Sequence, residues 1–103
     1  MSAFTAGLLY SVIEEYVSKR FIGTDKISAI ADLRAMCDLY IMGEVDEDTL
    51  RKDVKEYLEA MLAGIMELEE IEKGVDRIVK AARAETLRRR AFTRVGRGLP
   101  SLV

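Results

Sequence analysis

Histidine, tryptophan, asparagine and glutamine are all missing from this sequence of 103 residues, and proline and cysteine each occur once. Without histidine, the chain has no side chain whose ordinary pKa lies near neutral pH, and no imidazole can bind a metal ion. The serines and Cys37 therefore lack the base that would activate them as nucleophiles. We predict from these absences that the protein is not an enzyme and holds no metal ion or other cofactor.

The two missing amides coincide with a charged fraction of 33%. Loss of thermolabile amide side chains together with many charges is typical of proteins from hyperthermophiles. We therefore interpret the composition as thermophilic, with chance in a short chain as the alternative explanation.

A single cysteine excludes a disulfide within the chain, and the apolar run around Cys37 predicts a small buried hydrophobic side chain. The apolar residues 3–13 lead directly into Glu14 and Glu15, which leaves this run too short to span a bilayer. No basic segment precedes the run, which argues against a signal peptide. We expect a soluble, cytoplasmic protein that does not associate with membranes.

The residues that are present favour helices, because Ala, Leu, Met, Glu, Lys and Arg dominate. Apolar residues recur with helical spacing over 3–21 and 25–42, and a glycine follows each segment as a terminating residue. Thr24 or Asp25 is expected to cap the second helix. The apolar arc of that helix covers more than half of its circumference, which is typical of a central helix or of one in a subunit interface.

A third and longer helix is expected to begin near Glu47, capped by Asp46 or Asp48. Its apolar positions alternate in steps of four and three residues and form a heptad seam: Leu50, Val54, Tyr57, Met61, Gly64, Leu68, Ile71, Val75, Ile78 and Ala82. Since the seam keeps its register across Gly74, we predict one continuous helix. A break into two helices at Gly74 is the alternative.

The seam fails where its next positions hold Thr86 and Arg89, which a core accepts only when they are paired. We expect the helix to continue to about Phe92 with its last turns outside the core, followed by a flexible basic tail over 93–103. The fold predicted for 1–92 is all-α, a small antiparallel bundle of three or four helices with one long C-terminal helix. The wide apolar arcs of the first two helices predict a homo-oligomer.

The net charge of −2 hides two regions of opposite sign. Residues 1–76 contain 8 Lys and Arg against 17 Asp and Glu, a net of −9, whereas residues 77–103 contain 8 Lys and Arg against the single acid Glu85, a net of +7. The cations of this basic end are Arg77, Lys80, Arg83, Arg88, Arg89, Arg90, Arg94 and Arg97. Most of them form a helical stripe opposite the apolar seam, which is the arrangement that binding along a phosphate backbone requires.

Three explanations of this stripe are open. The first hypothesis is a nucleic-acid-associated protein that binds DNA or RNA phosphates non-specifically through the planar guanidinium groups. The second is a structural or adaptor protein that self-associates or docks on an acidic protein surface through the same arm. The third is a solvated face whose cations are favoured by the helix dipole near the C-terminus. The dipole, however, acts only within the last turn, and the stripe begins about four turns earlier. Neutralisation of these arginines by carboxylates of their own chain would remove the case for phosphate recognition.

Glu67, Glu69, Glu70 and Glu72 form an acidic cluster within the long helix. Paired carboxylates can hold Mg²⁺ or Ca²⁺, but the usual di-metal pattern of helical bundles requires histidine. We interpret the cluster as a solvated face, which can also receive the arginines of a neighbouring subunit.

Overall fold

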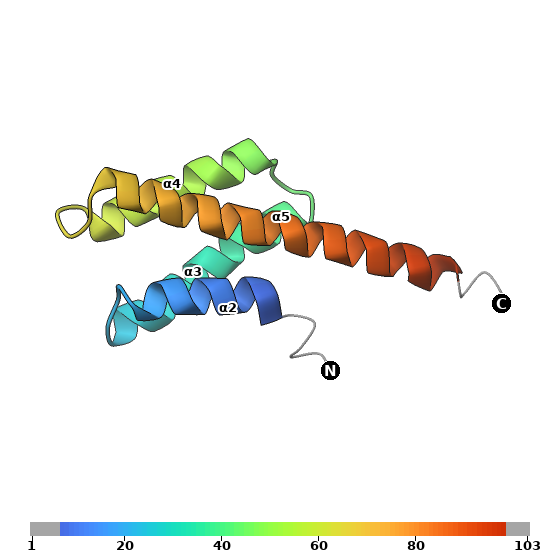
Figure 1. Ribbon diagram of the computed structural model, residues 1–103, viewed down its shortest axis with the longest axis horizontal. Helices are drawn as coiled ribbons and strands as arrows, with labels where there is room; N and C mark the ends of the chain where they lie inside the picture. Colours follow the sequence, from blue (N-terminus) through green and yellow to red (C-terminus); the bar gives the residue numbers. More distant parts are fainter. Residues whose placement is uncertain (1–6, 99–103) are drawn as a thin grey trace.

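The computed structural model describes the backbone of residues 7–98 and the side chains of residues 8–91. Four helices follow one another: α2 (Gly7–Ser18), α3 (Thr24–Ile41), α4 (Glu47–Leu62) and α5 (Leu68–Gly98). This part of the chain contains no strand, so the all-α prediction is confirmed for it. Figure 1 shows α5 running the length of the molecule, with α4 along one side, α2 along the other and α3 passing behind.

One core lies between the four helices, because each of them turns a stripe of apolar side chains inward. The buried apolar residues are Leu9, Ile13, Tyr16, Val17, Phe21, Ala29, Leu33, Cys37, Leu50, Val54, Leu58, Leu62, Ile71, Val75, Ile78, Val79, Ala81 and Ala82. Each large aliphatic side chain removed from water in this way contributes about 1.5–3 kcal/mol. Cys37 belongs to the core as predicted, and burial raises the pKa of its thiol to about 12.

The prediction of one continuous helix from Glu47 is wrong, because the chain turns between α4 and α5. Helix α4 ends at Leu62, whose carbonyl accepts hydrogen bonds from the backbone N–H groups of Ile65 and Met66 at 2.9 and 3.1 Å. Gly64 lies in this turn with φ of 79°, a conformation that favours glycine. Apolar residues recur at the seam spacing through the turn, although Met61 and Leu68 are exposed, so periodicity alone did not reveal the break.

The predicted seam also differs from the buried stripe of α4. The buried side chains of that helix follow intervals of four residues, at Leu50, Val54, Leu58 and Leu62. Tyr57 is only half-buried, and Met61 is exposed. A straight α-helix with 3.6 residues per turn drifts away from a strict heptad, and α4 follows its own contacts rather than the sequence repeat.

Gly74 lies inside α5, and the helix continues through it. A Cβ atom at this position would lie 2.4 Å from Cε1 of the Tyr16 ring. Glycine therefore allows α2 to approach α5 closely, and the alternative of a helix break at Gly74 is wrong.

The ends of the helices confirm some of the predicted signals. The Asp46 carboxylate accepts a hydrogen bond from the Thr49 N–H at 2.8 Å, which caps α4 and lowers the pKa of Asp46. Gly43, with φ of 85°, follows the C-cap of α3. The predicted side-chain cap of α3 is wrong, because its N-cap is Gly23, which offers no side chain. Helix α2 is shorter than the predicted 3–21, and residues 3–6 lie outside the described residues.

Burial extends one turn beyond the predicted end of the seam at Ala82. The buried Thr86 hydroxyl donates to the Ala82 carbonyl at 3.0 Å, and Glu85 is also buried. Helix α5 then continues to Gly98, past the predicted end near Phe92, and projects beyond the other three helices (Figure 1). The last five residues of the predicted tail, 99–103, lie outside the described residues.

Candidate interaction surface on helix α5

The first three predicted site residues on α5, Arg77, Lys80 and Arg83, each form an ion pair with a carboxylate. Arg83 holds Glu47 at the start of α4 with two guanidinium nitrogens, of which Nε donates to Oε1 at 2.9 Å. Arg77 is paired with Glu15 of α2, and Lys80 Nζ lies 2.9 Å from Oδ2 of Asp76. Arg77 and Arg83 therefore connect α5 to two other helices. Hydrogen bonds from these two arginines lower the pKa of Glu15 and that of Glu47, respectively.

Glu85 binds the next two arginines. Its side chain is only 1% exposed, and its Oε2 accepts from Nη2 of Arg88 at 2.6 Å and from Nε of Arg89 at 2.7 Å. Burial acts to raise the pKa of Glu85, but the hydrogen bonds and charges of the two arginines outweigh it and hold that pKa below its ordinary value. One carboxylate is therefore shared by two guanidinium groups.

The remaining predicted residues are Arg90, Arg94 and Arg97. Arg90 is exposed and makes no ion pair with the side chains of residues 8–91. Arg94 and Arg97 belong to the helical backbone of α5, and their side chains are outside the described residues. The six cations whose side chains are described therefore do not form one site.

Five of the six cations whose side chains are described are thus paired with carboxylates of the same chain. This is the arrangement that we expected to remove the case for phosphate recognition along the whole stripe. Ion pairs between exposed side chains contribute only about 0–1 kcal/mol, so they can exchange partners. In the sequence of α5, arginines outnumber acids from Arg88 onward.

Sequence reasoning missed an apolar strip that accompanies these arginines. Ala84, Leu87 and Ala91 are exposed, and their spacing of three and four residues places them along one side of α5, away from the core. The Leu87 side chain is 58% exposed. Their helical spacing was the available signal, but we interpreted this end of the chain only by its charge.

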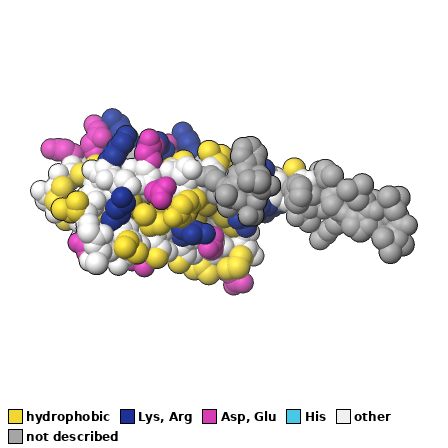
Figure 2. All heavy atoms as spheres, turned by 90° about the horizontal axis from the view of Figure 1, so that it is seen from below, with side chains coloured by type: hydrophobic (Ala, Val, Ile, Leu, Met, Phe, Trp, Pro, Cys, Tyr) yellow, Lys and Arg dark blue, Asp and Glu magenta, His cyan; other side chains and the backbone are white. Residues whose placement is uncertain are grey.

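A second exposed apolar strip follows the outer side of α3. Its residues are Ile27, Ala31, Ala35, Leu39 and Met42, all exposed. The inner side of the same helix is buried through Ala29, Leu33 and Cys37, so α3 is apolar on both sides. The wide arc predicted from the sequence is consistent with this arrangement. Figure 2 shows further hydrophobic side chains spread between charged ones over the face seen from below.

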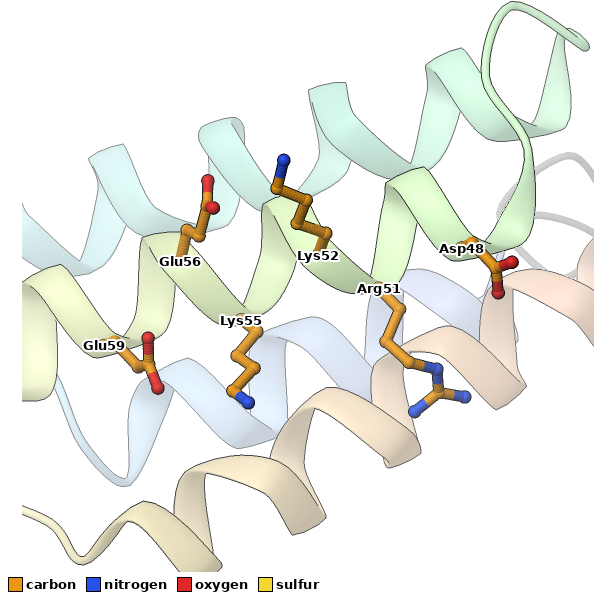
Figure 3. Close-up of a pocket in the computed structure, with 6 residues that line it drawn as sticks. All are labelled: Asp48, Arg51, Lys52, Lys55, Glu56 and Glu59. Carbon is orange, nitrogen blue, oxygen red and sulfur yellow. The ribbon is translucent and has the colours of Figure 1, made fainter.

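Two hollows on the described surface differ in size and lining. The one in Figure 3 has a volume of about 440 Å³ and lies on the outer side of α4, and its side chains splay outward rather than converge. Its lining combines three acids and three bases: Asp48, Arg51, Lys52, Lys55, Glu56 and Glu59. A second hollow beside Glu85 and Arg89 has only about 30 Å³, which is the space of about one water molecule.

The acidic cluster of Glu67, Glu69, Glu70 and Glu72 is exposed at the start of α5 and in the preceding turn. Lys73 lies 3.4 Å from a carboxylate oxygen of Glu70, and Lys55 of α4 lies 3.1 Å from one of Glu72. Across the described residues, no three His, Cys, Asp or Glu side chains are grouped as they would be to hold a metal ion.

Comparisons with known proteins give no assignment. No family model, curated protein or solved structure matches this chain. Within residues 7–98, no helix is both long and apolar enough to cross a membrane. The function is therefore argued from the surface of the molecule.

Proposed function

We propose that this chain is a non-enzymatic binding protein that self-associates or docks on an acidic protein surface through the projecting end of α5. We call this end, residues 84–98, the arm. The observation that carries the proposal is the combination of exposed apolar residues and excess positive charge on a helix end that projects beyond the other helices. Both properties are those of a surface that binds another protein.

The arm carries five arginines and one acid, Glu85, which gives a net charge of +4 from the sequence. Leu87 and Ala91 lie beside Arg88 and Arg90 in the described part of the arm and are exposed. A phosphate backbone offers little apolar surface that could cover Leu87, whereas a protein surface offers both carboxylates and apolar groups. Arginine and apolar side chains together are typical of protein–protein contacts.

The proposal also includes an antiparallel arrangement of the helices and the formation of a homo-oligomer. The order of the ion pairs supports the antiparallel arrangement, since Arg51 of α4 contacts Asp76 while the later Lys55 contacts the earlier Glu72. Exposed large hydrophobic side chains support a homo-oligomer: Leu8, Ile22, Ile27, Leu39, Met42, Met61, Ile65, Leu68 and Leu87. The many ion pairs between helices are consistent with the thermophilic interpretation of the composition.

Non-specific nucleic-acid binding is the second candidate function. One observation favours it: Arg90, Arg94 and Arg97 are spaced by four and three residues in a segment whose backbone is helical. Such spacing follows one side of a helix, and guanidinium groups in a row suit phosphates. The intrachain pairing of the earlier cations restricts this candidate to the arm.

The test compares Arg90→Glu with Lys52→Glu, which makes the same charge change at an exposed position of α4. Sedimentation equilibrium measures self-association, and gel shifts with random-sequence duplex DNA and RNA at low and high salt measure nucleic-acid binding. We expect wild type and Lys52→Glu to self-associate, and Arg90→Glu to weaken self-association by about tenfold, the effect of about 1.4 kcal/mol.

Two results would contradict the proposal. Steeply salt-dependent DNA or RNA binding that Arg90→Glu removes, with no self-association in the wild type, identifies the second candidate function instead. A monomeric wild type that retains neither nucleic acid nor immobilised poly-glutamate refutes both candidates.

A further inference from the structure

We infer that the surface receiving the arm is the outward side of α3 on a second copy of this chain. The inference rests on the proposed function and names its partner. It follows from the apolar strip of α3, from the matching strip of the arm, and from the opposite charges along their edges.

The sizes of the side chains along the strip on α3 suit the packing of a second helix against it. Ile27 and Met42 lie towards its two ends and are 71% and 66% exposed. Ala31 and Ala35 lie between them and are also exposed. Small side chains in the middle of a helix allow the backbone of a second helix to approach, while larger ones at the ends enclose it.

The arm supplies a complementary but shorter strip. Its exposed Ala84, Leu87 and Ala91 repeat at the three- and four-residue spacing that a helix uses to contact another helix. Leu87 is the large side chain of this strip, and it is exposed to solvent in the single chain. Helix α3 has 18 residues, a length of about 27 Å, and the arm has about 22 Å at the same rise per residue.

Charges along the edges of the two strips are opposite in sign. Asp25, Asp32 and Asp38 are exposed along α3, and Asp32 accepts a hydrogen bond from the Tyr57 hydroxyl at 2.8 Å. Arg34 is the exposed cation of this helix, and its guanidinium group lies 4.7 Å from the centre of the Tyr10 ring. The arm is basic beside its own strip, so contact between the two strips brings carboxylates to guanidinium groups.

The position of the arm points to a second molecule as its partner. The arm begins beside its own α3, where Arg34 and Asp38 line one hollow together with Glu85 and Arg89, and its far end projects beyond the other helices (Figure 1). A second copy can place its α3 against this arm and at the same time insert its own arm against the first α3. This reciprocal exchange contains the same contact twice and closes as a two-fold dimer, so no unpaired strip is left to continue a chain of subunits.

A cross-linking experiment tests which surfaces meet. Two variants are made in a Cys37→Ala background, one with Ala35→Cys on α3 and one with Ala91→Cys on the arm. We expect a disulfide-linked dimer when the two are mixed and oxidised, and none with either variant alone. A cross-link formed by Ala35→Cys alone indicates that α3 packs on α3 and overturns the inference, as does the absence of any cross-link in the mixture.

A substitution on α3 separates this inference from the proposed function. We expect Ala35→Glu to raise the dissociation constant of the dimer by about tenfold or more, because an unpaired charge enters an apolar contact. Ala60→Glu, at an exposed alanine of α4, is the matched control and leaves the constant unchanged. Circular dichroism melting establishes that both variants fold. If Ala35→Glu has no effect while Arg90→Glu weakens self-association, the proposed function stands and this inference fails.

Discussion

At the scale of single residues, Tyr16 is the position where burial and polarity conflict. Its side chain is 1% exposed, its hydroxyl has no hydrogen-bond partner within the described residues, and burial raises its pKa. The Arg20 guanidinium group lies 3.9 Å from the ring centre, which gives the ring a favourable contact but leaves the hydroxyl unpaired. Burial of the ring therefore stabilises the folded state, whereas burial of the unpaired hydroxyl destabilises it.

We predict that Tyr16→Phe raises the free energy of unfolding by up to about 1 kcal/mol, because a buried hydroxyl without a partner is removed. Tyr57→Phe is the control and lowers it by about 1 kcal/mol, because the Tyr57 hydroxyl donates to Asp32. Urea denaturation of the two variants beside wild type measures both effects. Destabilisation by Tyr16→Phe would mean that the hydroxyl has a partner, such as a buried water molecule.

At the scale of elements, the packing of α2 against α5 depends on Gly74. Glycine in the middle of a helix costs about 1 kcal/mol relative to alanine, so the sequence alone favours replacing it. The Tyr16 ring, however, occupies the space that a Cβ atom would need. Tertiary contact therefore reverses the effect that helix propensity predicts.

We predict that Gly74→Ala destabilises the protein by about 1–3 kcal/mol in chemical denaturation, because the added methyl group overpacks the contact. Adding Tyr16→Leu to this variant should recover part of the loss, because the smaller side chain vacates the space. Stabilisation by Gly74→Ala alone would show that α2 and α5 separate easily. An equal loss in the single and the double variant would show that the cost does not arise from Tyr16.

The elements themselves were predicted with unequal success. Local signals were sufficient for α3, expected over 25–42 and found at Thr24–Ile41, and for the Asp46 cap of α4. They failed at the turn between α4 and α5, where Gly64 was counted as a seam position. Apolar residues continue at the seam spacing through this turn, so the sequence pattern did not mark it.

At the scale of the whole molecule, acidic side chains form ion pairs between helices and within the arm. The carboxyl groups whose pKa is lowered are Glu15, Asp46, Glu47, Asp76 and Glu85. A folded pKa below the unfolded value means that the unfolded chain binds more protons as the pH falls. The stability from these groups is therefore present above their ordinary values of 3.8–4.5 and is lost as the pH falls through their folded values.

We predict a Tm that is nearly constant from neutral pH to about pH 5 and falls progressively below it, measured by circular dichroism at low ionic strength. Glu85→Gln should start from a lower Tm at neutral pH, because the charge-assisted bonds to Arg88 and Arg89 are weakened. Its Tm should then decline less steeply on acidification than that of the wild type. Identical pH profiles for the two proteins would contradict the role assigned to Glu85.

The candidate surface was only partly predictable, because the partners of its cations lie far from them in the sequence. The basic end and its eight cations are visible in the sequence, but their partners are not. Arg77 meets Glu15 across 62 positions of the chain, and Arg83 meets Glu47 across 36. Such pairs exist only when packed helices bring their surfaces together, so a stripe of charge cannot reveal which of its members are already engaged.

The amino-acid order alone was enough for the helical class, the burial of Cys37, the helix ends at Gly43 and Asp46, and the opposite charges of the two ends, because each depends on residue type and short-range spacing. Tertiary contact decided where the long helix is interrupted, why Gly74 is required, and which arginines are engaged by carboxylates. These depend on surfaces that are distant in the chain, and local patterns do not encode the distance between them.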